Sequence, residues 1–326
     1  MGGLRFCENE LVQPMSLAEY KNPPLLLLQA CRYWWAMRHH PRAFTLNDAL
    51  MGWRDLLLPE RFSYRRSLEC LAREARIERV GERIHKVTVV DQDLHFFWLG
   101  TPENGLHASI AQEFDPGIAH CYTTPPVKLS PRSLILDVGA CEGLFAFRVV
   151  RQGLAGKVIC FEPSKRTAEY LARAAQSNKV DDHIVVECLA VLRKSGRVKF
   201  IESDSPEANR VDSTSAGDNG QSVPAVSIDD YCAEKGIQLT SQDLIKIDAE
   251  GSDLEVLQGA EKMIRSGSPQ IAVTTYHKES HAFEIAAYLK SVQPAYRLRV
   301  KGMIVFGQPR FWDGPRPRPV LLQATV

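Results

Sequence analysis

The sequence lacks the features that would mark a membrane, secreted or nucleic-acid-binding protein. Its 326 residues carry a net charge of +1, so no global field favours nucleic acid or an anionic membrane as a partner. The longest apolar run near the N-terminus, Leu25–Leu28, is far too short to cross a bilayer and has no secretory signal layout. The eight cysteines are scattered without a Cys-x-x-Cys pair, which favours free thiols over disulfides or a zinc site. We therefore expect a cytoplasmic protein.

A phosphate-cradling glycine loop is also missing, although the surrounding pattern is that of a nucleotide-binding unit. The apolar run Leu134–Asp137 is followed by a glycine-containing turn, a helical pattern from Leu144, and a second apolar run that ends in Glu162. Such a strand–turn–helix–strand unit places a ligand at the carboxyl ends of parallel strands. Cys141 stands where a second glycine would fall, so the close backbone approach that a pyrophosphate needs is not provided. A nicotinamide-dependent oxidoreductase therefore fits poorly.

The acidic residues of this unit instead favour an amino-acid sulfonium ligand such as S-adenosylmethionine (SAM). Such a ligand needs room, a nearby carboxylate, and an acidic side chain for its ribose hydroxyls. Glu162 can accept hydrogen bonds from two hydroxyls, and Asp137 lies at the same expected crevice. Gly139, Ala140 and Gly143 would shape the methionine side of the site. The alternative is that Asp137 and Glu162 only cap helices.

The next predicted strand of the unit ends in the run Cys188-Leu189-Ala190. An adenine ring could lie there, between apolar side chains and backbone donors. Plain packing of the strand end explains the same residues equally well, so the sequence leaves both interpretations open.

The second half of the chain alternates strand-like and helix-like patterns, which predicts a parallel sheet covered by helices on both faces. Strands are expected at Leu134–Asp137, Val158–Phe161, Ile184–Val191, Leu244–Asp248 and Gln270–Tyr276, with helices beginning near Leu144, Ser164, Ser252 and His281. Ser252 and Glu255 form a predicted capping box. Tyr296–Val300 and Val320–Val326 are predicted to pair as closing strands. We thus expect an α/β domain over residues 131–326.

The residues before this domain are predicted to form a helical extension and a hairpin. Residues 1–85 are interpreted as helical, with a helix over Tyr64–Ile77. Residues 86–130 are interpreted as a β-hairpin and a connecting segment, because strand formers flank a polar turn at residues 91–93. We expect segment 1–85 to serve acceptor binding or oligomerisation, and segments 1–85 and 203–222 are the expected sources of a pocket for a second substrate.

A second group of polar residues follows two further predicted strands at the same sheet edge. Asp248 ends one strand, with Glu250 in the turn behind it, and His277 ends the neighbouring strand. A histidine beside a carboxylate is a natural general base near neutral pH. The three side chains could also hold a divalent cation, or Glu250 could serve only as a local cap. Lys246, inside the strand, indicates a partly open face or a buried ion pair.

Several motifs together resemble the FkbM-type SAM-dependent methyltransferases. They are Asp137–Gly143, Phe161–Ser164, Val226–Asp230, Ile245–Ala260, Tyr276–Lys278 and Pro294–Tyr296. The resemblance runs from about Glu113 to the C-terminus and implies a Rossmann-like class I methyltransferase fold, with a mostly parallel seven-stranded sheet and helices on both faces. The cofactor would then be expected beside Asp137, Gly139, Ala140, Cys141, Gly143, Glu162, Pro163, Ser164, Cys188, Leu189, Ala190 and Asp248. Cys141 stands where the family usually has asparagine.

The residues and the resemblance together predict direct transfer of the SAM methyl group to an acceptor hydroxyl. Asp248 and His277 would bind the acceptor and remove its proton, with Glu250 beside them. The expected acceptor is a small molecule, namely a sugar, a polyketide or a peptide-derived natural-product intermediate. An N-methyltransferase acting on a peptide, amide or amine and a non-catalytic SAM-binding scaffold stay open. Trp34 and Trp35 are expected to pack in the core or at a subunit interface, such as that of a homodimer.

Overall fold

The computed structural model describes residues 60–201, 210–212, 221–305 and 317–326, together with the single positions 28, 31 and 35. The helices predicted before residue 60 and most of segment 203–222 lie outside the described residues, and so does Trp34.

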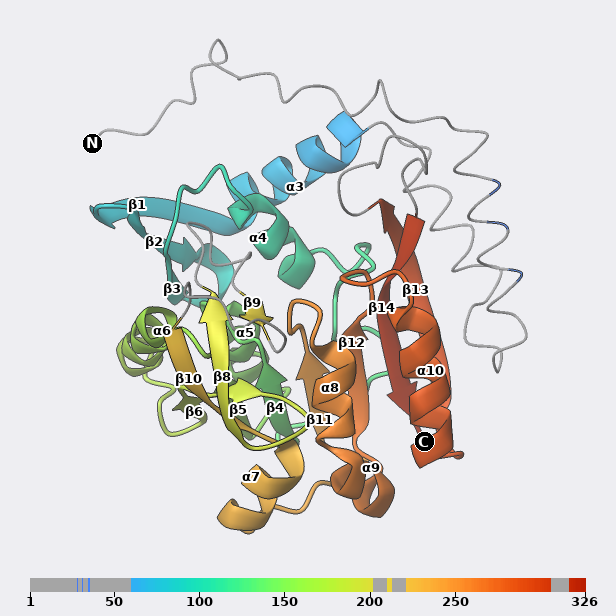
Figure 1. The fold of residues 1–326 in the computed structure, drawn as a ribbon. Helices are drawn as coiled ribbons and strands as arrows, with labels where there is room; N and C mark the ends of the chain where they lie inside the picture. The colour runs from blue at the N-terminus through green and yellow to red at the C-terminus, as the bar shows by residue number, and fades with distance from the viewer. Residues whose placement is uncertain are drawn as a thin grey trace.

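A seven-stranded sheet forms the centre of the described structure (Figure 1). Its order is β13-β14-β12-β11-β4-β5-β6, with β4 at Leu134–Val138, β5 at Lys157–Phe161, β6 at Ile184–Glu187, β11 at Leu244–Ile247, β12 at Gln270–Thr274, β13 at Arg297–Val305 and β14 at Pro317–Thr325. The strands β4, β5, β6, β11 and β12 pair in parallel, whereas β14 is antiparallel to both of its neighbours, β12 and β13. The expected mostly parallel, seven-stranded Rossmann-like sheet and its closing strand pair are confirmed.

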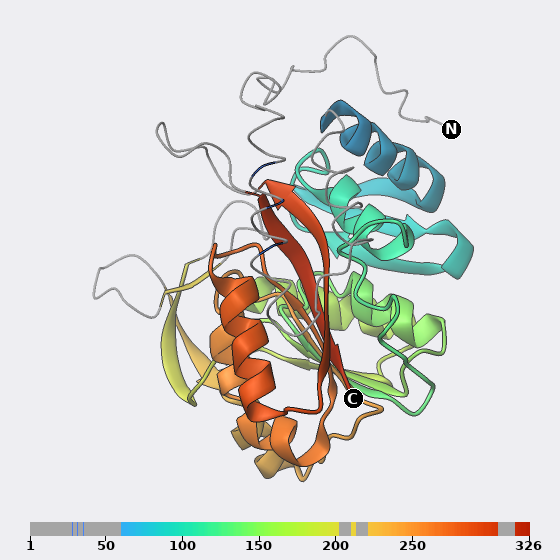
Figure 2. The ribbon, with the colours of Figure 1, turned by 90° about the vertical axis from the view of Figure 1, so that its right-hand side faces the viewer.

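Helices cover both faces of this sheet, because a strand directs alternate side chains to opposite sides. Along β4, Leu136 and Val138 belong to one buried cluster, whereas Ile135 belongs to another. The first cluster includes residues of α7 (Ile228–Lys235), α8 (Asp253–Gln258), α9 (Glu261–Gly267) and α10 (His281–Val292), and the second includes residues of α5 (Leu144–Arg151) and α6 (Lys165–Ser177). Figure 2 shows this layering from the side. The strand pattern of the sequence therefore translates directly into two helical layers.

All four predicted helix starts are confirmed, including that of α8, which begins directly after Ser252. The helices α5 and α10 begin at Leu144 and His281, the residues where the helical patterns begin. The helix α6 begins after Ser164, whose hydroxyl accepts a hydrogen bond from the backbone N–H of Thr167. Such a cap satisfies one of the N–H groups that the first helical turn leaves free. The start of the helical pattern and the capping serine thus predicted where these helices begin.

The predicted capping box at Ser252 is wrong. The Ser252 side chain makes no capping hydrogen bond at the start of α8. The fully buried carboxylate of Asp253 instead accepts hydrogen bonds from the backbone N–H groups of Ala249 and Gly251. The turn between β11 and α8 is therefore organised by the first residue of α8.

The described N-terminal part contains a small sheet that the sequence predicted only in part. Its elements are α3 (Glu60–Glu74), β1 (Ala75–Gly81), β2 (Ile84–Val89), β3 (Leu94–Trp98) and α4 (Leu106–Phe114). The hairpin of β2 and β3 is confirmed, but the helix predicted over Tyr64–Ile77 ends at Glu74. The chain continues as β1, with Ala75 opposite Val89, so strand pairing overrides the local helical pattern. The predicted boundary at residue 85 therefore falls inside one sheet.

The strand predicted over Ile184–Val191 is divided between two sheets. Its first part joins the central sheet as β6, and its last part pairs with a strand from a smaller, four-stranded sheet. The strands of this smaller sheet are β7 (Ala190–Val191), β8 (Gly196–Ile201), β9 (Arg210–Asp212) and β10 (Gln221–Val226). The chain thus turns away from the central sheet at Cys188 and Leu189, the residues predicted to lie beside an adenine ring.

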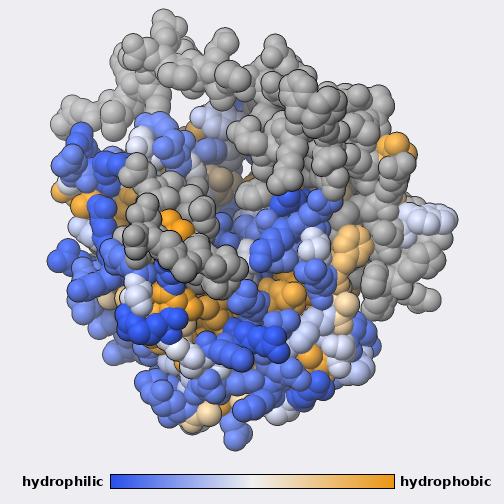
Figure 3. Space-filling model, in the orientation of Figure 1, coloured by the Kyte–Doolittle hydropathy of each residue, from blue (hydrophilic) through white to orange (hydrophobic). Residues whose placement is uncertain are grey.

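Within the part of the chain that the structure describes, no helix combines the length and the apolar character needed to cross a membrane. On the face shown in Figure 3, hydrophilic residues predominate and hydrophobic residues form small separate groups. Large apolar side chains such as Phe161 and Trp98 are fully buried.

Candidate active site

A cavity of about 410 Å³ lies at the carboxyl ends of β4, β5 and β11. Its wall includes nine residues that the sequence singled out: Gly139, Ala140, Cys141, Glu162, Pro163, Leu189, Ala190, Asp248 and Glu250. We call the residues that follow β4 and β5 the β4–β5 wall: Gly139, Ala140, Cys141, Glu162 and Pro163. A cavity of this size accommodates a small organic ligand.

Glu162 is fixed in the β4–β5 wall by two backbone donors. Its Oε1 accepts the N–H of Ser164 at 2.8 Å, and its Oε2 accepts the N–H of Cys141 at 3.1 Å. The residue is 5% exposed, so few other orientations are open to it. Each carboxylate oxygen can accept two hydrogen bonds. Glu162 therefore retains one acceptor position on each oxygen for a ligand in the cavity.

Burial raises the pKa of Glu162 to about 7, even though the N–H groups of Ser164 and Cys141 lower it. The side chain therefore exchanges its proton near neutral pH. A positively charged ligand beside it would favour the ionised form, because an opposite charge at short range stabilises a carboxylate. This part of the wall suits a cationic ligand that also carries hydroxyl groups.

The glycine turn after β4 packs directly against the end of β11. A Cβ atom at Gly139 would collide with the backbone carbonyl of Asp248, and the φ of +75° is one that side chains rarely adopt. The N–H groups of Gly139 and Ala140 point to the carbonyl of Phe161, at 3.1 and 3.2 Å. Backbone contacts therefore hold three strand ends together.

Asp137 lies behind this turn and does not line the cavity, which corrects its predicted place at the crevice. Its fully buried carboxylate pairs with Lys246 Nζ at 2.8 Å, and the same ammonium donates to the carbonyl of Gly139 at 2.8 Å. The two residues are register partners in β4 and β11, so their side chains leave the sheet on the same face. Burial lowers the pKa of Lys246, but Asp137 outweighs burial and holds that pKa above its ordinary value. The buried ion pair predicted for Lys246 is confirmed.

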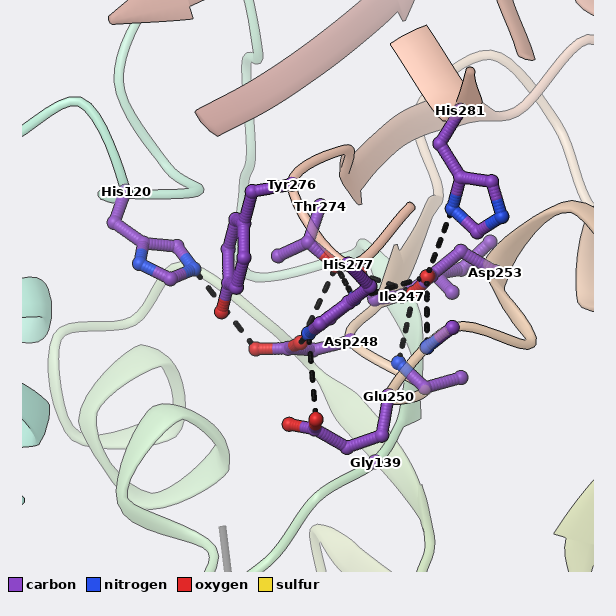
Figure 4. A network of polar contacts seen from close by, with 12 residues as sticks. His120, Gly139, Ile247, Asp248, Glu250, Asp253, Thr274, Tyr276, His277 and His281 are labelled. Carbon is purple, nitrogen blue, oxygen red and sulfur yellow. Dashed lines mark hydrogen bonds and ion pairs between the residues drawn. The ribbon is translucent and has the colours of Figure 1, made fainter. Parts of the chain in front are cut away.

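A second part of the cavity wall contains Asp248, Glu250 and Tyr276 together with His120 and Tyr122, and we call it the β11–β12 wall. Figure 4 shows the polar network around Asp248. Asp248 Oδ2 accepts a hydrogen bond from the Tyr122 hydroxyl at 2.7 Å, and Oδ1 accepts one from the Thr274 hydroxyl at 3.2 Å. The Asp248 side chain is 19% exposed. The network thus presents an oriented carboxylate to the cavity.

His277 lies behind Asp248 and is absent from the cavity wall. Its Nε2 lies 3.5 Å from Asp248 Oδ1 and 3.6 Å from Glu250 Oε2, and its Nδ1 lies 3.0 Å from Asp253 Oδ2. Burial would lower the pKa of His277, but Asp253 and Glu250 outweigh burial and raise it to about 11. The imidazole is only 4% exposed and does not face the cavity, so it is not placed to take a proton from an acceptor there, and the prediction of a general base is corrected. The geometry makes His277 a residue that orients its carboxylate neighbours.

Asp253, which the sequence analysis did not single out, anchors His277. Burial would raise the pKa of Asp253, but the contacts with His277 and His281 outweigh burial and hold that pKa well below its usual range. The Thr274 hydroxyl lies 3.1 Å from Asp253 Oδ1 and 3.2 Å from Asp248 Oδ1, so the two carboxylates share its one proton. The anchor is therefore an ionised carboxylate with a fixed orientation.

His120, Tyr122 and Tyr276 are cavity residues that the sequence analysis did not assign to the site. His120 and Tyr122 belong to the connection between α4 and β4. The His120 ring meets the rings of Tyr122 and Tyr276 edge-on, with centroids 5.6 and 5.2 Å apart. Burial lowers the pKa of His120 to about 4, with Asp248 opposing that effect. The sequence offers one weak signal for them, a His-Cys-Tyr run close to two prolines.

Three further predicted cofactor residues lie away from the cavity wall. Gly143 precedes the first residue of α5, and Ser164 caps α6. Cys188 is exposed, and its thiol points to the carbonyl of Pro163. These three residues therefore shape the turns and helix starts beside the cavity and do not line it.

The helix α4 lines a part of the cavity that the sequence analysis expected segment 1–85 to line. Ala108, Ser109 and Gln112 of this helix line the cavity, and no described residue before Ala108 does so. Phe200 of β8 and Ile304 of β13 complete it from other directions. This side of the cavity is thus assembled from several separate segments.

Comparison with known proteins gives one matching family and one curated relative. Residues 137–296 match the family model described as Methyltransferase FkbM domain. The 2-O-methyltransferase NoeI of Sinorhizobium fredii (strain NBRC 101917 / NGR234) is 27% identical over 150 residues, which cover 41% of this chain and 60% of that protein. The match thus spans less than two thirds of this relative's length.

The solved structures that are similar to parts of the chain include two further methyltransferases. Methyltransferase FkbM from Methylobacillus flagellatus KT is 21% identical with a TM-score of 0.44, and the match covers 62% of this chain and 46% of that one. The O-methyltransferase from Bacillus cereus, in complex with SAH, is 16% identical with a TM-score of 0.37, and the match covers 60% of this chain and 74% of that one.

Proposed function

The chain belongs to the FkbM methyltransferase family through its residues 137–296, and on this premise we propose that it catalyses SAM-dependent O-methylation. The acceptor would be a hydroxyl group of a sugar or a natural-product intermediate. In this reaction a bond forms between the acceptor oxygen and the methyl carbon as the bond from that carbon to the sulfonium sulfur breaks. S-adenosylhomocysteine (SAH) leaves, and the hydroxyl proton passes to a base and then to solvent.

The observation that carries this proposal is the pair of carboxylates in one cavity. Glu162 is held by two backbone N–H groups with acceptor capacity to spare, which suits the two ribose hydroxyls of SAM. Asp248, in the same cavity, is held by two hydroxyl donors and is partly exposed. One cavity therefore offers a place for the donor and a polar place for the acceptor.

The β4–β5 wall would bind the cofactor. Glu162 would hold the ribose, the Gly139 turn would leave room for the methionine part, and Leu189 and Ala190 would border the adenine ring. The sulfonium charge would favour the ionised form of Glu162. This assignment keeps the predicted residues that line the cavity and gives Asp137 and Lys246 a supporting role.

The β11–β12 wall would bind the acceptor. The hydroxyl of the methyl acceptor would donate a hydrogen bond to Asp248. Asp248 would then take the hydroxyl proton as the bond to the methyl carbon forms. Tyr122 and Thr274 hold this carboxylate, and His277 supports it from behind. Much of the rate acceleration would come from holding the acceptor oxygen, methyl carbon and sulfur in line. His277 is thus a positioning residue and Asp248 the base in this scheme.

A hydroxyl is preferred to an amine as the acceptor for two reasons. The wall around Asp248 combines a carboxylate, a second carboxylate at Glu250 and the phenol of Tyr276, all suited to hydrogen bonds with hydroxyl groups. The relative NoeI is described as a 2-O-methyltransferase. Both observations support transfer to oxygen on a polyhydroxylated small molecule.

The test is methyl transfer from SAM with a deuterated methyl group to a panel of sugars, polyketides and peptide-derived amines, followed by mass spectrometry. We expect products that carry the label on oxygen and survive base hydrolysis as methyl ethers. Labelled amines would replace the O-methylation proposal with N-methylation. Retained SAM binding without any labelled product would favour a scaffold protein, and absence of SAM binding to folded protein would remove the proposal altogether.

A further inference from the structure

We propose that Asp248, Glu250 and His277 bind a divalent transition-metal ion in the β11–β12 wall. Each residue offers one ligand atom, and the three atoms lie within 4.8 Å of one another. Two ligand atoms that each lie about 2.0 to 2.3 Å from one ion are separated by less than this distance. The His277 imidazole would release its Nε2 proton to solvent as the ion binds, because a ligating histidine must be neutral.

The three ligands come from elements that the fold holds firmly. Asp248 directly follows β11, Glu250 lies in the turn before α8, and His277 follows β12 (Figure 4). The strands β11 and β12 are parallel neighbours, so their carboxyl ends meet at one place. Glu250 has a positive φ of 46°. Backbone strain of this kind concentrates at ligand sites, because the surrounding structure must hold it in place.

A supporting carboxylate already orients the histidine as a metal ligand requires. The Nδ1 of His277 lies 3.0 Å from Asp253 Oδ2, which leaves Nε2 directed at Asp248 and Glu250. Histidines that bind metals usually donate their other ring N–H to a carboxylate in this way. Asp253 is itself held by the N–H groups of the β11–α8 turn. This contact fixes the orientation of the imidazole before any ion binds.

The negative charge of the carboxylates around His277 also favours a bound cation. Three carboxylates, those of Asp248, Glu250 and Asp253, converge on one imidazole ring. The nearby ammonium of Lys246 is already paired with Asp137. Next to the site, His120 Nε2 is a buried atom with no hydrogen-bond partner among the described residues, 3.9 Å from Asp248 Oδ2. Asp253 is fully buried and Asp248 is only 19% exposed, and buried carboxylates are stabilised by pairing or by coordinating a metal.

The donor set selects the class of ion. Carboxylates suit Mg²⁺, Ca²⁺ and Mn²⁺, and an imidazole nitrogen suits Fe²⁺ and Zn²⁺, so a set of two carboxylates and one imidazole fits a first-row transition metal such as Mn²⁺, Fe²⁺ or Zn²⁺. Asp248 and Glu250 both line the cavity and are 19% and 36% exposed, so the ion would face the cavity on one side. Its remaining coordination positions would be open to oxygen atoms of a ligand there.

This site would define the acceptor more closely, an extension that rests on the proposed methyl transfer. A cation with two open positions binds two neighbouring oxygen atoms, so the expected acceptor is a vicinal diol, as found in many sugars. Coordination lowers the pKa of a bound hydroxyl and so would help Asp248 to accept the proton.

The direct test is a titration of EDTA-treated full-length protein with Mn²⁺. Binding is measured as the loss of the sharp electron paramagnetic resonance signal of free Mn²⁺. We expect one Mn²⁺ per chain and at least about tenfold weaker binding for Glu250→Gln and for Asp248→Asn. Glu234→Gln, which removes an exposed carboxylate on α7, is the matched control and should bind Mn²⁺ like the wild type. Thermal melts of each variant confirm that it is folded.

Two results would overturn the cation site: no protein-dependent loss of the Mn²⁺ signal, or equal Mn²⁺ binding by wild type and the Glu250→Gln variant. Calorimetric titration of SAH in the presence of EDTA separates this outcome from the proposed function. SAH binding without Mn²⁺ binding removes the cation site and leaves the methyltransferase proposal intact. Mn²⁺ binding without SAH binding removes the methyltransferase proposal and leaves the cation site intact.

Discussion

The two walls of the cavity are held in place by different means. In the β4–β5 wall, backbone N–H groups fix Glu162, and both donors belong to the same strand–turn–helix unit. In the β11–β12 wall, side chains hold Asp248, and the donor Tyr122 lies 126 positions away in the sequence. The first wall is therefore a local structure, and the second exists only after the whole domain has folded.

This difference suggests how the two walls respond to change. A wall built from backbone contacts keeps its shape when side chains vary, so it suits a cofactor that stays the same. A wall built from side chains of separate segments can be altered one residue at a time, which suits a variable acceptor. The division holds even though the walls touch, where the turn at Gly139 packs against the carbonyl of Asp248.

The largest effect is expected from Asp248→Asn. The amide keeps the shape of the side chain and can still accept the hydrogen bond of Tyr122, but it is no longer a base. We expect turnover to fall by about 100-fold or more, the usual contribution of a general base, while SAH affinity stays within about twofold of the wild type. Steady-state kinetics and calorimetry on the same preparation measure both quantities.

The matched control for this change is Asp181→Asn, which alters an exposed carboxylate in the connection between α6 and β6. It should leave both turnover and SAH affinity unchanged. If Asp248→Asn weakened SAH binding as much as turnover, the separation into a cofactor wall and an acceptor wall would be wrong.

The next largest effect is expected from Glu162→Gln, and it should fall on binding. The amide loses the negative charge beside the sulfonium and can no longer accept at both terminal atoms. A hydrogen bond to a charged group contributes roughly 1.5 to 3 kcal/mol, so SAM affinity should fall by about 10- to 100-fold. Glu169→Gln, on the exposed side of α6, is the control. Unchanged SAM affinity in Glu162→Gln would move the ribose site elsewhere.

The contrast between the walls also explains what the sequence could predict. Glu162, Gly139 and Cys141 lie close together in the chain, so one motif was enough to place them in the cavity. Asp137 belongs to the same motif, yet its side chain lies on a face of the sheet against Lys246. The spacing located the strand end correctly, but the fate of that side chain depended on its register with β11, which no local pattern shows.

The β11–β12 wall was predictable only where strand ends marked it. Asp248 and Glu250 follow from the motif after β11, and His277 was correctly placed at the end of β12. The role of His277 was not predictable, because Asp253 lies at the start of α8 and contacts the imidazole only in the folded domain. Tyr122 precedes the first strand of the sheet in a segment without regular spacing, so nothing in the sequence tied it to Asp248.

A smaller effect is expected from Tyr122→Phe, which tests whether side chains really organise the β11–β12 wall. The change removes the hydroxyl that donates to Asp248 Oδ2 and leaves the buried ring in place. Loss of one hydrogen bond to a carboxylate should lower turnover by about tenfold, with little change in SAH affinity. Tyr288→Phe removes a hydroxyl with long contacts near α9 and should have no effect on turnover. Equal turnover in the two variants would show that Asp248 is oriented by other contacts.

The smallest effect is expected from pH, and it should be confined to the β4–β5 wall. The pKa of Glu162 is about 7 in the folded protein against an ordinary 4.5, so the folded chain holds this proton more tightly than the unfolded chain. The stability that the proton contributes is complete below pH 4.5 and is lost as the pH rises through 7. SAM favours the ionised form, so its binding must release the proton in acid. Its affinity should therefore fall by about tenfold from pH 8 to pH 6.

Calorimetric titrations of SAM in buffers with different ionisation enthalpies measure this proton release directly. We expect nearly one proton released per SAM bound at pH 6 and almost none at pH 8, because Glu162 is already ionised there. The Glu162→Gln variant has no proton to lose, so its weaker affinity should not vary over this range. A pH dependence that persisted in the variant would come from another group, and the link between burial of Glu162 and cofactor binding would be broken.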